Sequence, residues 1–204
     1  MIAEGKIGPQ YGAAGSLGTA TFDNSWALRT AQAHGRYQEA VYRGNCYTAA
    51  NQAAGALSLL SSTATGFILT NPLASGKGLA VLDICVALAT APAGAATICL
   101  SLGPYSATAV TQTTALVVRN LLMTGATGSA VGLAASAATL PATPVVIRAL
   151  GGGPVAASSI SPAFIRDEIA GQIILLPGCS LNVHSLTTAI SAVISIAWEE
   201  IPIL

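Results

Sequence analysis

In Ile190-Ser-Ala-Val-Ile-Ser-Ile-Ala-Trp198, apolar residues recur at every second position, and this pattern is the clearest indication of the fold. One face of an extended chain takes Ile190, Ala192, Ile194, Ile196 and Trp198. The other face takes Ser191, Ser195 and Glu199. A period of two is the pattern of a half-buried β-strand, so the sequence predicts a strand over residues 188–198.

The segment before this strand follows the same pattern. Leu181 and Val183 alternate with Asn182 and His184, which predicts a second strand with His184 on its polar side. Leu176-Pro177-Gly178 precedes it and predicts a tight turn, since Pro fixes one φ and Gly accepts a positive one. The C-terminal third therefore reads as a strand, a turn and two further strands.

Upstream, residues 37 to 176 break into short apolar runs separated by Gly, Pro, Asn and Ser. Many short runs with turn signals between them favour an all-β sandwich or barrel. We expect a jelly-roll-like antiparallel β-sandwich over residues 37–204 and an extended N-terminal arm over residues 1–36. The first run, Glu39 to Tyr42, is expected to be a strand, and the Ala- and Gly-rich segment 123–143 an irregular loop.

The composition is unusual for a free domain. Hydrophobic residues make up 52% of the 204 residues and charged residues 8%, with a formal net charge of +0. Ordinary soluble domains carry about 25% charged residues, and their charge keeps neighbouring molecules apart. We infer that much of this surface contacts other protein chains.

A membrane protein is the rival explanation of so apolar a sequence. The uncharged stretches 84–118 and 120–147 are interrupted by Pro92, Pro104, Pro141 and Pro144, and no basic cluster flanks them. Both features argue against spanning helices. The first ten residues contain Glu4 and Lys6 and no apolar run, so we also expect no secretion signal.

No combination of residues required for catalysis stands out. Ala74-Ser75-Gly76-Lys77-Gly78 is similar to a phosphate-binding loop, but Asn71 stands where that motif needs Gly and Gly78 where it needs Ser or Thr. We expect a hairpin loop there. Adjacent strand residues such as Glu199 and Glu200 point to opposite faces, so they are expected to be a solvated strand end or an intersubunit ion pair rather than an acid–base pair.

Other ligand classes are disfavoured as well. The four cysteines, Cys46, Cys85, Cys99 and Cys179, form no Cys-x-x-Cys pair, which argues against zinc. Eight basic residues are balanced by eight acidic ones, so no basic stripe for nucleic acid is evident. We expect no enzyme activity, no cofactor, no metal and no nucleic-acid partner.

Two segments combine turns and strands in a characteristic order. The first is Gly171-Gln-Ile-Ile-Leu-Leu-Pro177-Gly178 followed by a strand and Ser195-Ile-Ala-Trp198-Glu199-Glu200-Ile-Pro202. The second is Gly66-Phe-Ile-Leu-Thr-Asn71-Pro72 with Ser75-Gly76-Lys77 and a long strand. Both segments resemble structural proteins of tailed bacteriophages. The resemblance covers about a third of the chain, and its motifs are turn and strand patterns.

The resemblance implies a jelly-roll virion protein of the capsid decoration, or cement, type. Its partners would be the major capsid protein or other virion proteins, its place the capsid surface and its state a homotrimer. The alternative is a tail-fibre, head-fibre or glycan-binding host-attachment module on the same fold. The candidate interface residues are Trp26, Arg29, Arg36, Asn71 and Lys77.

Overall fold

The computed structural model describes residues 4–6, 17–19, 35–90, 92–123, 129–153 and 164–203. The chain divides into two compact units, Met1–Glu39 and Ala40–Leu204, so the predicted boundary after residue 36 lies slightly before this division. In the first unit the strands β1 (Glu4–Lys6) and β2 (Leu17–Thr19) pair antiparallel. Of the rest of the predicted arm, the structure describes only Gly35 and Arg36.

A short helix, α1 (Gln38–Tyr42), stands where the sequence predicted a strand over Glu39–Tyr42. Gly35 supports its first turn, because the Gln38 amide donates to the Gly35 carbonyl at 3.0 Å and Gln38 Oε1 accepts from the Gly35 amide at 3.2 Å. The prediction of a strand here was wrong, since these local hydrogen bonds favour a helical turn.

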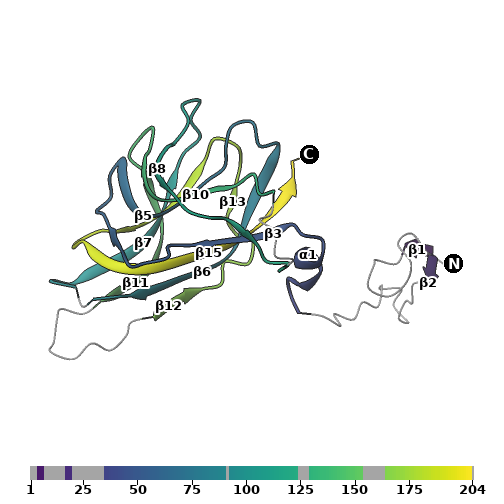
Figure 1. Ribbon diagram of the computed structural model, residues 1–204, viewed down its shortest axis with the longest axis horizontal. Coiled ribbons are helices and arrows are strands. Elements are labelled where there is room, and N and C mark those ends of the chain that lie inside the picture. Colours follow the sequence, from purple (N-terminus) through teal and green to yellow (C-terminus); the bar gives the residue numbers. More distant parts are fainter. Residues whose placement is uncertain are drawn as a thin grey trace. The chain divides into compact units, whose positions relative to one another are not determined.

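The second unit is a sandwich of two antiparallel sheets (Figure 1). The six-stranded sheet has the order β11-β7-β14-β5-β10-β8. Its strands are β5 (Thr63–Thr70), β7 (Ala96–Gly103), β8 (Thr111–Ala115), β10 (Leu133–Thr139), β11 (Val145–Gly153) and β14 (Ser180–Ser185). The sequence prediction of an all-β sandwich is confirmed.

The seven-stranded sheet has the order β12-β6-β15-β3-β9, with β13 beside β6 and β4 beside β15. Its long strands are β3 (Cys46–Ala50), β6 (Lys77–Leu88), β12 (Phe164–Asp167) and β15 (Ile190–Pro202). Its short strands are β4 (Gly55–Leu57), β9 (Arg119–Asn120) and β13 (Ile174–Leu175).

The strand pairing is nested, which makes the sandwich a jelly roll. The outermost pair in the sequence is β3 with β15. Inside it lie β5 with β14, then β6 with β12, and innermost β7 with β11. Successive pairs alternate between the two sheets, as in a long hairpin rolled around a core. The β8 and β10 strands are an addition between β7 and β11, and β10 extends the six-stranded sheet beyond β5.

The main core lies between the sheets and is made of residues from alternate strand positions. On β15, Ile190, Ala192, Ile194, Ile196 and Trp198 are all buried, as the sequence pattern predicted. Trp198 is fully buried and stacks on Tyr47 of β3, with ring centroids 6.3 Å apart and an interplanar angle of 28°. Such an aromatic pair contributes about 0.5–1.5 kcal/mol beyond the area it buries.

Two sequence predictions about the connections were wrong. The segment 123–143 contains the strand β10, although its residues favour helix. Pairing with β5 and β8 and burial of Ala135 and Ala138 outweigh the local preference. The loop after Thr70 is no hairpin loop, since β5 and β6 belong to different sheets and the chain crosses between them. No helix in the described ranges is both long and apolar enough to cross a bilayer.

Candidate functional site

The predicted interface residues fall in different parts of the chain. Trp26 and Arg29 lie outside the described residues. Arg36 is exposed, and its Cζ lies 5.7 Å from the centre of the Tyr37 ring, a cation–π distance. Asn71 and Lys77 lie at the two ends of the connection that crosses from β5 to β6. The structure brings this last pair together, and the assignment of all five residues to an interface stays a prediction.

Asn71 is fully buried and forms hydrogen bonds with three other segments of the chain. Its Nδ2 donates to the Lys77 carbonyl at 2.7 Å and to the Leu175 carbonyl at 2.8 Å. Its backbone amide donates to the Cys179 carbonyl at 3.0 Å, and its carbonyl accepts from the Gly178 amide at 2.8 Å. Asn71 therefore holds the loop before β6, the end of β13 and the Gly178 turn in one arrangement.

Lys77 neutralises a buried acid. Lys77 Nζ lies 3.0 Å from Glu200 Oε2, and the Glu200 side chain has no exposed surface. Glu200 Oε1 accepts from the backbone amides of Val131 at 2.7 Å and Gly132 at 2.9 Å. The prediction that Glu200 belongs to a solvated strand end or an intersubunit pair was wrong, because this residue continues the inner face of β15 and finds its partners within the chain.

The Leu176-Pro177-Gly178 turn forms as the sequence predicted and supports a cavity. The Cys179 amide donates to the Leu176 carbonyl at 3.1 Å, and Gly178 has a φ of +85°. A Cβ on Gly178 would lie 2.9 Å from Leu73 Cδ2 and 2.9 Å from Tyr105 Cδ2. The Leu73 and Tyr105 side chains therefore pack directly on the glycine backbone.

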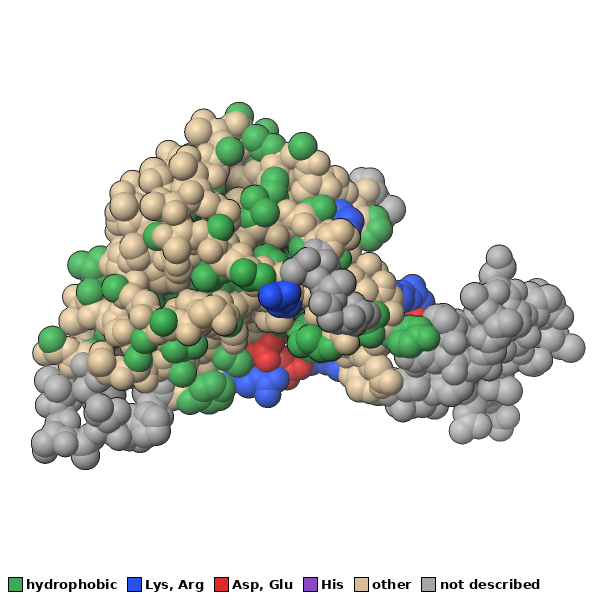
Figure 2. All heavy atoms as spheres, viewed as in Figure 1, with side chains coloured by type: hydrophobic (Ala, Val, Ile, Leu, Met, Phe, Trp, Pro, Cys, Tyr) green, Lys and Arg blue, Asp and Glu red, His purple; other side chains and the backbone are tan. Residues whose placement is uncertain are grey.

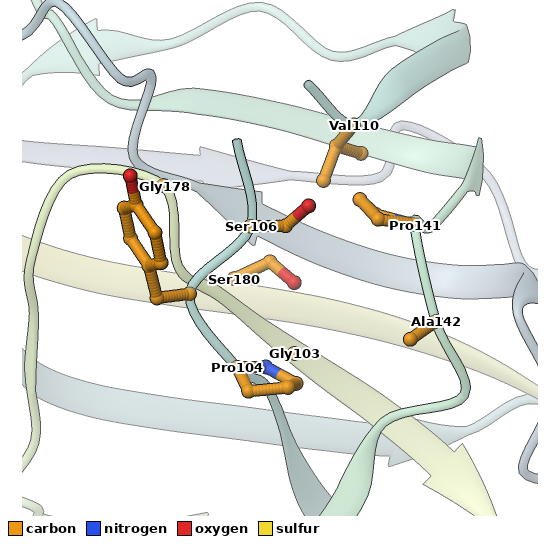
Figure 3. A pocket seen from close by; sticks show the side chains of 9 residues that line it. Gly103, Pro104, Ser106, Val110, Pro141, Ala142, Gly178 and Ser180 are labelled. Carbon is orange, nitrogen blue, oxygen red and sulfur yellow. The ribbon is translucent and has the colours of Figure 1, made fainter. Parts of the chain in front are cut away.

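The cavity beside this turn has a volume of about 140 Å³. It is lined by Gly103, Pro104, Tyr105, Ser106, Val110, Pro141, Ala142, Gly178 and Ser180. Figure 3 shows the hydroxyl groups of Ser106 and Ser180 on one side of it, with Pro141 and Ala142 opposite. Tyr105 is 68% exposed, so the ring packed on Gly178 also presents surface to solvent.

A second hollow of about 110 Å³ adjoins this cavity, because Ser106, Val110 and Gly178 line both spaces. Its walls are more apolar and include Pro72, Leu73 and Leu133. Leu73 and Leu133 are 42% and 43% exposed. The Gly178 turn is thus surrounded by accessible apolar side chains.

Charge is distributed very unequally between the two sheets. The six strands of the six-stranded sheet contain a single Lys, Arg, Asp or Glu, namely Arg148. The seven-stranded sheet carries Lys77, Asp83, Arg119, Arg166, Asp167, Glu199 and Glu200. In Figure 2 the part of the surface over β5, β8 and β10 shows no charged side chain.

The single charge of the six-stranded sheet is itself paired across the sandwich. Arg148 Nε on β11 lies 2.8 Å from Asp167 Oδ2 on β12, so this ion pair joins the edges of the two sheets. Next to it, Arg166 Nη2 lies 2.7 Å from Asp83 Oδ2 within the seven-stranded sheet. The positive charge of Arg148, the single charge in the strands of the six-stranded sheet, is therefore partly neutralised by Asp167.

Both outer strands of the six-stranded sheet are irregular. The β8–β10 pairing shifts register twice, and so does the β11–β7 pairing, at Val146/Arg148 and Ala149/Gly151. Bulges twist a sheet edge and make it a poor template for another strand. Neither edge of this sheet therefore offers a regular template for pairing with a further strand.

His184 is fully buried, which corrects the prediction that it lies on a polar face. All six residues of β14 are buried, including the outward Ser180, Asn182 and His184, because the strand lies between β5 and β7 and its outer face is covered. Neither ring nitrogen of His184 makes a hydrogen bond of good geometry within the described residues. Burial lowers the pKa of His184, and a weak backbone contact with Ser58 opposes this only in part.

The described residues include no group of three or more His, Cys, Asp or Glu that could hold a metal ion. All four cysteines are free thiols, with Cys46 and Cys99 buried and Cys85 and Cys179 half-buried. Burial raises the pKa of Cys46 to about 11, and the nearby Glu199 adds to the shift.

No family model, curated protein or solved structure matches this chain.

Sequence reasoning missed the lining of the cavity. Tyr105, Ser106 and Ser180 come from two segments that only the fold brings together. The predicted turn at Gly178 was the one available signal, because it marked a place where the backbone must approach other residues closely. Nothing in the sequence indicated which side chains would pack there.

Proposed function

We propose that this protein is a virion structural protein that decorates or cements a tailed-phage capsid by binding between major capsid subunits. The observation that carries the proposal is the near absence of charge on the six-stranded sheet, where Arg148 is the only ionised residue of six strands. Interface cores are depleted in Lys, Glu and Asp relative to the rest of a protein surface. A surface of this kind suits permanent contact with other chains.

Exposed apolar side chains on the same side support this role. Val145, Val146 and Ile147 are 62%, 36% and 44% exposed on β11. Tyr105 and Leu133 add to them around the Gly178 turn. Contiguous exposed apolar surface is uncommon on free monomers and marks interaction sites.

The sandwich suits binding to other chains through a large contact surface. A clamp between capsid subunits needs faces that keep their shape while loops contact both neighbours, and a jelly roll supplies such faces. We expect the protein to be a homotrimer with the major capsid protein as its main partner and the capsid surface as its location.

Electron microscopy of particles that contain this chain tests the proposal directly. Density for the sandwich between capsid subunits, with the six-stranded sheet facing them, is the expected result. Density in a tail or a fibre would contradict capsid decoration and favour the host-attachment alternative. A capsid surface that lacks the sandwich would contradict the proposal as well.

Sedimentation velocity of the purified chain tests self-association separately. We expect a species of three 20.3-kDa chains, and partial dissociation when Val145 and Ile147 are both changed to Glu. Val193→Glu is the matched control, because Val193 is 38% exposed on β15 of the charged sheet. A monomer at every concentration would rule out the trimer.

A further inference from the structure

We propose that the cavity beside the Gly178 turn, lined by Tyr105, Ser106 and Ser180, binds one ring of a neutral sugar. The inference does not rest on the proposed role in a capsid. It rests on the size, lining and charge of this cavity, which lies wholly within the second unit of the chain.

The size of the cavity fits a six-membered ring. A cavity of about 150 Å³ is known to hold benzene, and this one has a volume of about 140 Å³. Pro104 and Pro141 line it, and the fixed φ of each proline restricts the backbone at these two positions of the wall. A pyranose has this ring size, and because the cavity is open to solvent beside the exposed Tyr105, the hydroxyl groups of the sugar can extend beyond it.

Tyr105 supplies a flat surface for such a ring. One side of its side chain packs against the Gly178 backbone, since a Cβ there would lie 2.9 Å from Tyr105 Cδ2. The residue is nevertheless 68% exposed. The face of an aromatic ring is electronegative, and the C–H bonds of a sugar are weakly positive, so the two attract each other.

Two hydroxyl groups supply directional contacts. Ser180 is 2% exposed, and its Oγ accepts a hydrogen bond from Asn182 Nδ2 at 3.3 Å. Ser106 Oγ accepts one from the Thr108 amide at 3.0 Å. Neither hydroxyl donates to another described residue, so both O–H groups are available to the oxygen atoms of a ligand.

The charge of the lining selects the class of sugar. None of the described residues that line the cavity is Lys, Arg, His, Asp or Glu. An acidic sugar would bring a carboxylate to a site that has no cation to pair with it, at a cost in desolvation. The site therefore favours neutral glycosides over sialic acid or phosphorylated sugars.

The experiment is a titration of the full chain with methyl glycosides of glucose, galactose, mannose and N-acetylglucosamine. Binding is followed by saturation-transfer NMR and by amide chemical shifts, with N-acetylneuraminic acid as the acidic probe. We expect at least one neutral glycoside to bind with a Kd on the order of 1 mM, as for a small open site. The shifts should be largest at residues 103–106 and 178–180.

Three tyrosine variants make the test specific. Tyr105→Ala should weaken binding about tenfold, and Tyr105→Phe should retain it because the ring face remains. Tyr42→Ala is the control, since Tyr42 is also half-exposed but does not line the cavity. The amide spectrum of each variant checks that the fold is intact.

Several outcomes would overturn the proposal. They are the absence of saturable binding by any neutral glycoside at tens of millimolar, equal binding by Tyr105→Ala, and preference for the acidic sugar. The variant with Val145 and Ile147 changed to Glu should bind the glycoside normally. Failure of the capsid role and failure of sugar binding are therefore distinguishable.

Discussion

Lys77 and Glu200 form an ion pair at 3.0 Å that closes one end of the seven-stranded sheet. The two residues lie on neighbouring strands, β6 and β15, and the acid points inward while the base remains 38% exposed. Because Glu200 also accepts the Val131 and Gly132 amides, the pair fixes the segment that leads into β10. A charged residue thus adds two hydrogen bonds to a segment that also packs against the main core through Ala130 and Val131.

Glu200→Gln should therefore destabilise the protein strongly. The amide keeps one acceptor for the backbone N–H groups but places its own N–H groups against the Lys77 ammonium. We expect a loss of about 2–4 kcal/mol in the free energy of unfolding, measured in urea. Glu199→Gln on the opposite, half-exposed face should change it by less than about 0.5 kcal/mol. Equal effects of the two variants would refute a special role for Glu200.

His184 makes stability depend on pH. Its pKa in the folded protein is lowered from the ordinary value of 6.5, so the unfolded chain binds a proton that the folded protein does not. The stability that neutral His184 contributes to the folded protein is fully present above pH 6.5. It is lost progressively as the pH falls toward the lowered pKa. The expected slope in this window approaches 1.4 kcal/mol per pH unit.

The measurement is the unfolding free energy in urea between pH 8 and pH 5, for the wild type and for His184→Gln. The glutamine variant should lose most of the dependence near pH 6. If both proteins weaken in parallel as the pH falls, groups other than His184 control the acid response.

Gly178→Ala should lower the free energy of unfolding more than Gly76→Ala does. Both glycines have a positive φ, +85° and +65°, which costs a residue with a Cβ about 1–2 kcal/mol. Only at Gly178 would the new Cβ also meet other atoms, Leu73 Cδ2 and Tyr105 Cδ2 at 2.9 Å. Thermal and urea unfolding should show the cost of backbone strain alone in Gly76→Ala, and the cost of strain plus the close contacts in Gly178→Ala. Similar costs would show that the Tyr105 and Leu73 side chains move aside freely.

The cysteines should react with alkylating agents in a fixed order. Cys85 and Cys179 are half-buried, whereas Cys46 and Cys99 are fully buried. With a pKa of about 11, roughly one Cys46 thiol in a thousand is ionised at pH 8. Iodoacetamide labelling followed by peptide mass spectrometry should find Cys46 modified last. Early modification of Cys46 would mean that β3 separates from the sandwich in the native protein.

Much of the fold was predictable, because strands with one buried face repeat every two residues. The β15 strand was predicted over 188–198 and extends to Pro202, since the paired charge of Glu200 allows the inner face to continue. The turn at Gly178 and the strand after it were also predicted.

The missed elements depend on partners far away in the sequence. The alanines of β10 carry no strand preference of their own, and their conformation is set by β5 and β8 on either side. The burial of His184 follows from the coverage of the outer face of β14, which alternation along one strand cannot reveal. The cavity lining was missed for the same reason, because Tyr105 and Ser180 meet only in the folded chain.

The central position of β15 has a consequence for how the protein is made. This strand lies between β3 and β6, so the sheet has a gap until residues 190–202 have left the ribosome. Folding must then bring together segments separated by most of the chain, which is slow. We therefore expect nascent chains to remain dependent on chaperones until synthesis has passed this strand, and fragments that stop before it to aggregate.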